Sequence, residues 1–164
     1  MPNWCYNRVE IHSEKEGAIR RFKDFVEDCD NPFSLYKIMP MPKKVAASME
    51  PDPNHPHVIR LSELRIPTSD DWYHWRNNMW GVKWDTSEPN GEDGRYAGLE
   101  RCSMNTYETY LVYNFDTPWG PPNGIYRYLA DDGLEHITRD PEATIRWYYH
   151  EWGMGAEGYL SLQD

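Results

Sequence analysis

No stretch of this 164-residue chain approaches the roughly 18 consecutive apolar residues that a membrane-spanning helix requires. Residues 1–8 also lack the continuous apolar segment of a secretory signal peptide. We therefore expect neither membrane insertion nor secretion. A chain of this length closes one hydrophobic core without cross-links, so a single domain over residues 1–164 is predicted.

Cysteine is scarce, and no CxxC pair occurs among Cys5, Cys29 and Cys102. An odd number of cysteines leaves at least one thiol unpaired, which fits a reducing compartment better than an oxidising one. The cysteine content therefore predicts a cytoplasmic protein.

Basic residues are few, because 17 Lys and Arg stand against 27 Asp and Glu, giving a formal charge of -10. Such a chain repels a phosphate backbone unless its positive groups gather on one face, so direct nucleic-acid binding is not expected. The acidic residues are spread along the chain, which is typical of a solvated surface. If the fold aligned several of them, that surface would attract a basic host protein.

Short catalytic motifs are missing: the chain has no Gly-x-Ser-x-Gly, P-loop, GxGxxG or HExxH. Among the histidines, His55 and His57 are too close for one helix face, and the others show no metal-ligand spacing. His150 adjoins Glu151, but adjacent strand residues point to opposite faces, which argues against an acid–base pair. The sequence thus predicts no catalytic residue, metal or cofactor and favours a non-enzymatic protein, without excluding an enzyme.

Aromatic residues, by contrast, make up 15% of the chain, and four tryptophan-centred clusters stand out. These clusters lie at residues 1–5, 80–85, 116–122 and 151–153. Tryptophan combines a large apolar area with one N–H group, so such clusters suit either a packed junction or a recognition surface.

The first half of the chain predicts a strand, a helix and a second strand. Residues 5–12 alternate between two faces, and Ser13 with Glu16 forms a capping box for a following amphipathic helix. Residues 33–38 are the second strand candidate. An insertion over about residues 43–79 is expected to contain a helix with Trp72, Trp75 and Met79 on one face, capped by Thr68, Ser69 or Asp70.

The second half predicts a hairpin, a helix and a closing hairpin. The first hairpin joins residues 95–103 and 107–117 through a turn at 104–106. A short helix over residues 123–130 ends at Gly133, and residues 143–150 return to 158–162. The fold class is therefore α+β, resembling a ferredoxin-like split βαβ antiparallel sheet with helices on one face, an inserted helical and loop segment, and an extra C-terminal hairpin.

Five segments together resemble one family: MPNWCYN, FSLYKIMPMP, WGVKWD, FDTPWGPP and YYHEWGMGAEGYL. They are similar to the Api92-like proteins of phages and mobile elements, an uncharacterised family with a ferredoxin-like domain. The resemblance implies a small accessory protein of the host cytoplasm, with no established activity and no iron–sulfur cluster. The cysteine count agrees on the last point, since such clusters need four thiolate ligands.

The candidate binding residues come from the tryptophan clusters. In one interpretation Trp80, Val82 and Trp84 share one side of an extended segment and enter the core, while Lys83 and Asp85 form a solvated or structural pair. In the other, Lys83 and Asp85 are the polar groups of a pocket for a planar or anionic ligand. The predicted binding set is Trp80, Lys83, Trp84, Asp85, Trp119, Asn123 and Trp152.

Two functions follow. The leading hypothesis is a phage or mobile-element accessory protein that binds and modulates a host cytoplasmic protein without catalysis, nucleic-acid-handling and defence factors being candidate partners. The alternative is a protein that holds a nucleotide or other anion between Lys83, Trp84, Trp119 and the helix opening at Asn123, acting as a sponge or, less readily, as a hydrolase.

Overall fold

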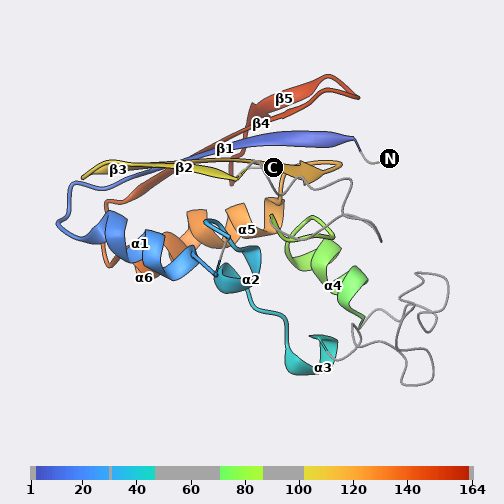
Figure 1. The fold of residues 1–164 in the computed structure, drawn as a ribbon, viewed down its shortest axis with the longest axis horizontal. Helices are drawn as coiled ribbons and strands as arrows, with labels where there is room; N and C mark the ends of the chain where they lie inside the picture. The colour runs from blue at the N-terminus through green and yellow to red at the C-terminus, as the bar shows by residue number, and fades with distance from the viewer. Residues whose placement is uncertain (1–2, 30, 47–70, 87–101, 163–164) are drawn as a thin grey trace.

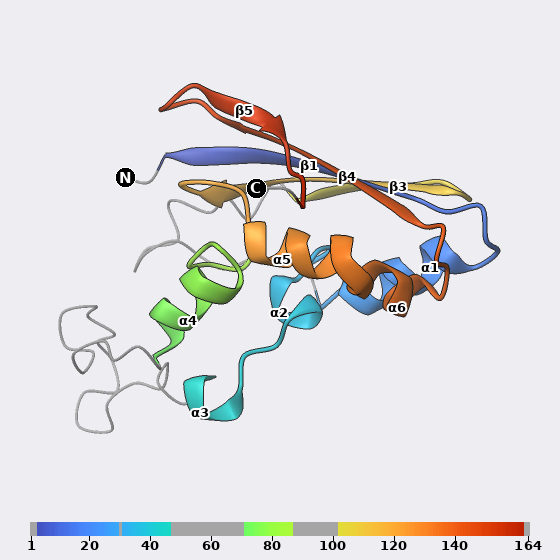
Figure 2. The same cartoon turned by 180° about the vertical axis from the view of Figure 1, so that it is seen from behind.

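The computed structural model describes residues 3–29, 31–46, 71–86 and 102–162. Within them a five-stranded antiparallel sheet, in the order β2-β3-β1-β4-β5, lies against a layer of helices on one side (Figure 1). Seen from behind, the helices again lie on that side alone (Figure 2). This arrangement confirms the predicted α+β class with an antiparallel sheet. None of the helices in the described ranges has the length and apolar character needed to cross a membrane.

The central strand β1, Trp4–His12, pairs along its length with β3, Tyr110–Pro118, and with β4, Thr144–Glu151. Its odd-numbered residues are buried against the helices, and its even-numbered residues lie on the other face. The strand expected at residues 5–12 is therefore confirmed. It was readable from the sequence because a sheet covered on one face only requires alternating apolar and polar residues.

Helix α1, Ala18–Val26, buries the apolar stripe that the sequence indicated. Its predicted capping box is wrong, since the N-cap is Gly17 at φ 72° and no side chain caps the helix. The Ser13 hydroxyl instead donates to a carboxylate oxygen of Asp140, 2.6 Å away, and accepts from the Lys15 N–H. The Ser13 side chain therefore bonds to Asp140, far along the chain, instead of capping α1.

The strand predicted at residues 33–38 is also wrong, because this segment forms the short helix α2, Leu35–Ile38. The Ser34 hydroxyl accepts from the Lys37 N–H at 3.2 Å. The Asp85 carboxylate accepts from the N–H groups of Leu35 and Tyr36 at 2.8 and 3.0 Å. These acceptors satisfy amides that would otherwise be unpaired at a helix start.

The predicted insertion contains two described helices, α3, Lys43–Ala46, and α4, Trp72–Met79. The N-cap of α4 is Asp71, which corrects the expected cap, while residues 68–70 lie outside the described residues. The inward position on α4 is Arg76, at 2% exposure, whereas Met79 is 43% exposed. The guanidinium lies over the Trp72 and Trp80 rings at 5.4 and 4.7 Å. Trp72 and Trp75 are partly buried against the core, as expected, so arginine takes the place of Met79 beside them.

The first predicted hairpin exists but its turn is displaced. Strand β2 is Ser103–Thr106, so the residues expected to turn are part of the strand. The Tyr107 N–H donates to the Tyr110 carbonyl at 2.8 Å and closes the turn there instead. Residues 95–101 lie outside the described part of the chain.

A longer helical stretch than expected follows β3. Helix α5, Asn123–Tyr128, continues through the π-helical turn η3, Leu129–Gly133, into α6, Leu134–Thr138. Gly133 therefore does not end the helix: a Cβ there would lie 2.6 Å from a carbon of the Tyr128 ring. The glycine allows a close ring contact inside the helix, and the stretch ends at Arg139, φ 58°.

The closing hairpin is confirmed, with β4 returning as β5, Ala156–Tyr159, which begins two residues earlier than predicted. Between the sheet and the helices, Phe33 lies 4.8 to 5.8 Å from the rings of Tyr113, Phe115 and Trp147. Beside this cluster the buried Asn7 amide accepts from the Trp147 indole N–H at 3.0 Å. The same amide donates to the Thr117 hydroxyl at 2.8 Å, so both ends of this buried amide are satisfied. The Tyr113 hydroxyl, by contrast, is buried without a hydrogen-bond partner in the described part of the chain.

Candidate functional site: the tryptophan end of the sheet

The four tryptophan clusters of the sequence meet at one end of the sheet. Trp4, at the start of β1, pairs with Pro118 at the end of β3, and its neighbour Cys5 pairs with Glu151 at the end of β4. The start of β1, marked by the N-terminus in Figure 1, thus lies beside the ends of both neighbouring strands. We call this region, comprising Asn3, Trp4, residues 80–85, 118–123 and 151–154, the tryptophan end.

Asn3 connects three of the clusters. Its carbonyl accepts from the Trp119 N–H at 2.8 Å. Its side-chain amide lies so close to Gly153 that a Cβ there would be 2.1 Å from the amide nitrogen. The segments that carry Trp4, Trp119 and Trp152 are therefore in direct contact.

The fourth cluster, residues 80–85, is held by both ring and backbone contacts. The rings of Trp4 and Trp84 are 6.4 Å apart. The Gly124 N–H, near the start of α5, donates to the Trp80 carbonyl at 3.1 Å. A Cβ on Gly124 would lie 1.7 Å from the Met79 carbonyl oxygen, so the two backbones approach as closely as glycine permits.

Trp80 belongs to the core rather than to an exposed binding surface. The side chain is fully buried, and its indole N–H donates to the Met39 carbonyl at 2.9 Å. Val82 is buried as well, whereas Trp84 is half-buried. The segment is a series of bends, not the extended strand we expected, so the three residues do not share one environment.

Asp85, which the sequence offered either as a ligand group or as part of a structural pair, makes several internal hydrogen bonds. Besides capping α2, its carboxylate accepts from the Ser34 hydroxyl at 3.0 Å and from the Thr86 N–H at 2.7 Å. The Asn31 amide donates to it as well, at 3.3 Å. With these donors engaged, the carboxylate joins residues 31–36 to the end of the tryptophan cluster.

Lys83 lies on the tryptophan end without joining Asp85 in a pair. Its ammonium nitrogen is 3.9 Å from the centre of the Trp84 ring, a cation–π contact. Partial burial lowers the pKa of the Lys83 ammonium. Asn123 is exposed, and its N–H donates to the Pro121 carbonyl at 2.8 Å, which leaves this opening of α5 less able to bind an anion.

Trp119, Trp152 and Met154 project from the tryptophan end, with exposed fractions of 57%, 73% and 76%. Trp119 has a left-handed backbone at φ 70°, a conformation that side chains other than glycine adopt at a cost. The Trp152 ring stacks on His150 with ring centres 3.8 Å apart. These are large apolar side chains held outward at one end of the molecule.

The buried Glu151 fixes the turn that carries Trp152. Its two carboxylate oxygens accept from the N–H groups of Gly153 and Met154 at 2.8 and 2.6 Å. Its neighbour His150 lies on the opposite face of the sheet, as the alternation predicted. Sequence reasoning did not assign Glu151 or Asn3 to the site. The sequence does contain one indication of the role of Glu151: an acidic residue directly before Trp152-Gly153 can accept hydrogen bonds from the backbone of the turn that follows.

Cys5 and Cys102 are poorly placed for reactivity, whereas Cys29 is exposed. Burial raises the pKa of the Cys5 thiol to about 12, and burial likewise raises that of Cys102 to about 12. In the described ranges, no group of three or more His, Cys, Asp or Glu side chains is placed to hold a metal ion.

No family model, curated protein or solved structure matches this chain. The resemblance to the Api92-like proteins therefore stays a prediction.

Proposed function

We propose that this chain is a non-enzymatic binding protein and that the tryptophan end docks a partner protein. The observation that carries the proposal is the outward position of Trp119, Trp152 and Met154 on a rigid support. Tryptophan is enriched among the residues that dominate binding energy at protein interfaces, and each one buries about 150–250 Å². Because Asn3 and Glu151 fix the local backbone, little conformational entropy is lost on docking.

We also propose that the domain is ferredoxin-like. The order β2-β3-β1-β4 supports this, as does the antiparallel pairing of β1 with both β3 and β4. Helix α1 follows β1, and α5 to α6 connect β3 with β4 on the same side of the sheet (Figure 1). In this assignment β5 is an addition at the edge beyond β4.

The partner is proposed to be a host cytoplasmic protein, with this chain acting as a phage or mobile-element accessory protein. The support is the sequence resemblance together with the formal charge of -10. A strongly acidic protein is attracted to basic proteins, and nucleic-acid-handling factors carry basic surfaces.

The alternative small-ligand function has less support. A pocket formed by Lys83, Trp84, Trp119 and Asn123 needs polar groups available to a ligand. Lys83 lies on the Trp84 ring, and the Gly124 N–H next to Asn123 is bonded to the Trp80 carbonyl. The contacts of the candidate residues are thus largely internal.

Site-directed photo-cross-linking in a bacterial host tests the proposed function. A photoreactive phenylalanine analogue replaces Trp119 or Trp152, and Phe25 or Tyr36 in matched controls, both of which are 40% exposed on the helix layer. We expect the same partner band from both positions of the tryptophan end and a much weaker band from the controls. Equal cross-linking from all four positions would contradict the proposal.

A further inference from the structure

Strand β5 is one edge of the sheet, and no described element lies beyond it (Figures 1 and 2). On its inner side it pairs with β4, and the Leu160 N–H donates to the Trp147 carbonyl at 2.9 Å, which fixes the phase of the hydrogen bonds. Because these bonds alternate along an antiparallel pair, Gly158 bonds to β4, whereas the N–H and C=O groups of Glu157 and Tyr159 point outward. The outer edge of β5 thus presents backbone groups that no described strand pairs.

The side chains of β5 turn back over the sheet instead of shielding this edge. The Glu157 carboxylate accepts from the Tyr148 hydroxyl at 2.9 Å and lies 3.7 Å from a ring nitrogen of His150, both on β4. The Tyr159 ring contacts Tyr148 at 5.5 Å, and the Arg146 guanidinium lies 5.0 Å from its centre. Edge strands of monomers are commonly blocked by lysine, proline or a bulge, and β5 has no lysine or proline. The edge is therefore open to a further strand.

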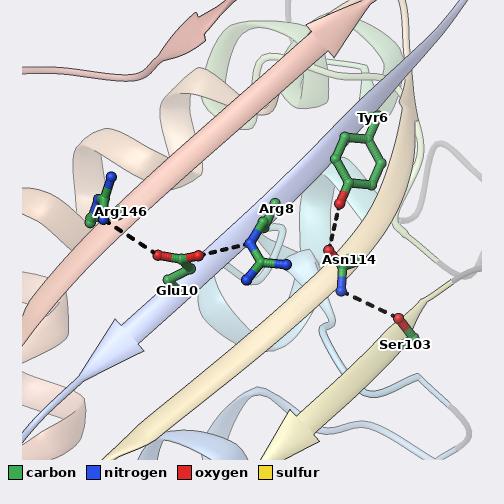
Figure 3. A network of polar contacts seen from close by, with 6 residues as sticks. All are labelled: Tyr6, Arg8, Glu10, Ser103, Asn114 and Arg146. Atoms are coloured by element: carbon green, nitrogen blue, oxygen red, sulfur yellow. Dashed lines mark hydrogen bonds and ion pairs between the residues drawn. The ribbon is translucent and has the colours of Figure 1, made fainter.

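The sheet face opposite the helices, by contrast, pairs its polar groups internally. In the view of Figure 3, Glu10 joins Arg8 at 2.7 Å and Arg146 at 3.9 Å. The Tyr6 hydroxyl donates to the Asn114 side chain at 2.6 Å. These contacts link β1, β3 and β4 to one another, so the polar groups of this face are engaged while those along the β5 edge are not.

The β5 edge is complementary to itself. When two copies of β5 pair antiparallel about a two-fold axis at Gly158, the outward groups of Glu157 lie opposite those of Tyr159 of the second copy, and each finds a partner. The axis then passes through a pair without hydrogen bonds, in which Cα atoms approach to about 4.5 Å. Glycine brings no side chain to this close approach.

The residues that flank β5 favour the same arrangement. Met154 precedes the strand with 76% of its side chain exposed, and Leu162 follows it with 54% exposed. Antiparallel pairing places the start of one strand beside the end of the other, so Met154 of each copy lies near Leu162 of the other. A second copy therefore supplies an apolar contact at both ends of the strand, which an unrelated strand would have to provide anew.

From this geometry we infer that the β5 edge pairs with β5 of a second copy of this chain and joins the two sheets into one. The inference is independent of partner docking, because Trp119 follows β3, which β1 and β4 separate from β5. A four-residue strand with its flanks buries less than the roughly 1,200–2,000 Å² of a stable interface. The dimer is therefore weak, with a dissociation constant on the order of 10–100 µM.

Sedimentation velocity over about 5 to 500 µM protein tests the inference, at about 0.15 M salt to screen the charge of -10 on each copy. We expect a concentration-dependent shift from monomer to dimer. Amide hydrogen exchange, followed by NMR at the two ends of this range, should slow at Glu157 and Tyr159 in the dimer because their N–H groups become bonded. A monomer throughout, or a dimer in which these two amides stay unprotected, would overturn the inference.

Two variants at one position isolate the edge hydrogen bond. Glu157→Ala and Glu157→Pro both remove the carboxylate, but only proline removes the outward N–H, and neither breaks a bond to β4. Alanine should change the dissociation constant by less than about threefold. Proline should raise it by more than about tenfold, because the bond is lost in both copies.

The opposite edge of the sheet provides the matched control. The Tyr107 N–H bonds to the Tyr110 carbonyl, so by the same alternation the Thr106 N–H points outward from β2. Thr106→Pro should leave the dimer unchanged. Equal dissociation constants for Glu157→Pro and Glu157→Ala, or equal weakening by proline at both edges, would overturn the inference. Thermal unfolding verifies that each variant is folded, and the exchange measurement needs no variant.

Discussion

Replacing Asp85 with alanine tests whether this residue is structural or ligand-binding. The carboxylate accepts hydrogen bonds from the N–H groups of Leu35, Tyr36 and Thr86 and from the Ser34 hydroxyl. Removal leaves the first two amides of α2 without their acceptor, although Ser34 still caps the helix, and it removes several of the hydrogen bonds that join residues 85–86 to residues 31–36.

The magnitude follows from the number and burial of these donors. Loss of a helix cap costs about 1 kcal/mol. Each buried donor left without a partner costs about 1–3 kcal/mol, and water reaches the amide of exposed Tyr36 more readily than that of buried Leu35. We therefore expect Asp85→Ala to lower the free energy of unfolding by about 2–4 kcal/mol.

Urea denaturation followed by tryptophan fluorescence measures this change. Asp131→Ala, which removes an exposed carboxylate from η3, serves as the charge-matched control and should change stability by less than about 0.5 kcal/mol. A loss below about 0.5 kcal/mol for Asp85→Ala as well would refute the capping role and revive Asp85 as a ligand group.

Three further outcomes are expected. Gly124→Ala should destabilise the protein by more than about 3 kcal/mol in urea denaturation, because the added Cβ would meet the Met79 carbonyl at 1.7 Å; a neutral result would contradict the close approach. At about pH 8 a maleimide should label the exposed Cys29 quickly, and the buried Cys5 and half-buried Cys102 much more slowly; equally rapid labelling of all three would contradict the protection of Cys5 and Cys102. Folding raises the pKa of the Cys5 thiol to about 12, so its contribution to the free energy of unfolding is complete below about pH 8.5, the unfolded value, and is lost as pH rises toward 12. Above about pH 8.5 the free energy of unfolding of a Cys5→Ala variant should therefore decline less steeply than that of the unmodified protein. Parallel declines in the two proteins would argue against the raised pKa.

The elements with a strong local period were predictable from sequence. Strand β1 alternates because one of its faces lies under the helices, and α1 carries its apolar stripe at helical spacing. The turn-forming glycines between β4 and β5 likewise indicated the closing hairpin. In these elements the buried positions are apolar and the exposed positions are polar, so the residue types alone indicate the structure.

Elements stabilised from a distance were not predictable. Helix α2 is capped locally by Ser34, but its first amides are accepted by Asp85, 50 positions after Leu35. No window around residues 33–38 contains that second contribution. Gly133 resembles a helix end because glycine often follows the last turn of a helix. In the structure, the glycine instead lies inside the helical stretch, where the absence of a side chain allows the Tyr128 ring to pack closely. Ser13 was assigned to a local cap although its hydroxyl bonds to Asp140, 127 positions away.

The candidate site was predictable in composition but not in arrangement. The tryptophan clusters were visible as motifs, yet only the strand register brings Trp4, Trp119 and Trp152 to one end. The same register assembles a row of Tyr6, Asp116, His150 and Glu157 from four strands. The positions of these residues along the chain do not indicate which of them become neighbours across the sheet.

The most direct test of the tryptophan end is the affinity of the cross-linked partner for two double variants, measured by calorimetry. Trp119→Ala with Trp152→Ala removes the two exposed indoles, and Phe25→Ala with Tyr36→Ala removes comparable exposed rings from the helix layer. We expect the tryptophan variant to lose on the order of 30-fold or more in affinity and the control less than about twofold. Unchanged affinity of a folded tryptophan variant would contradict the assignment of this end as the binding surface.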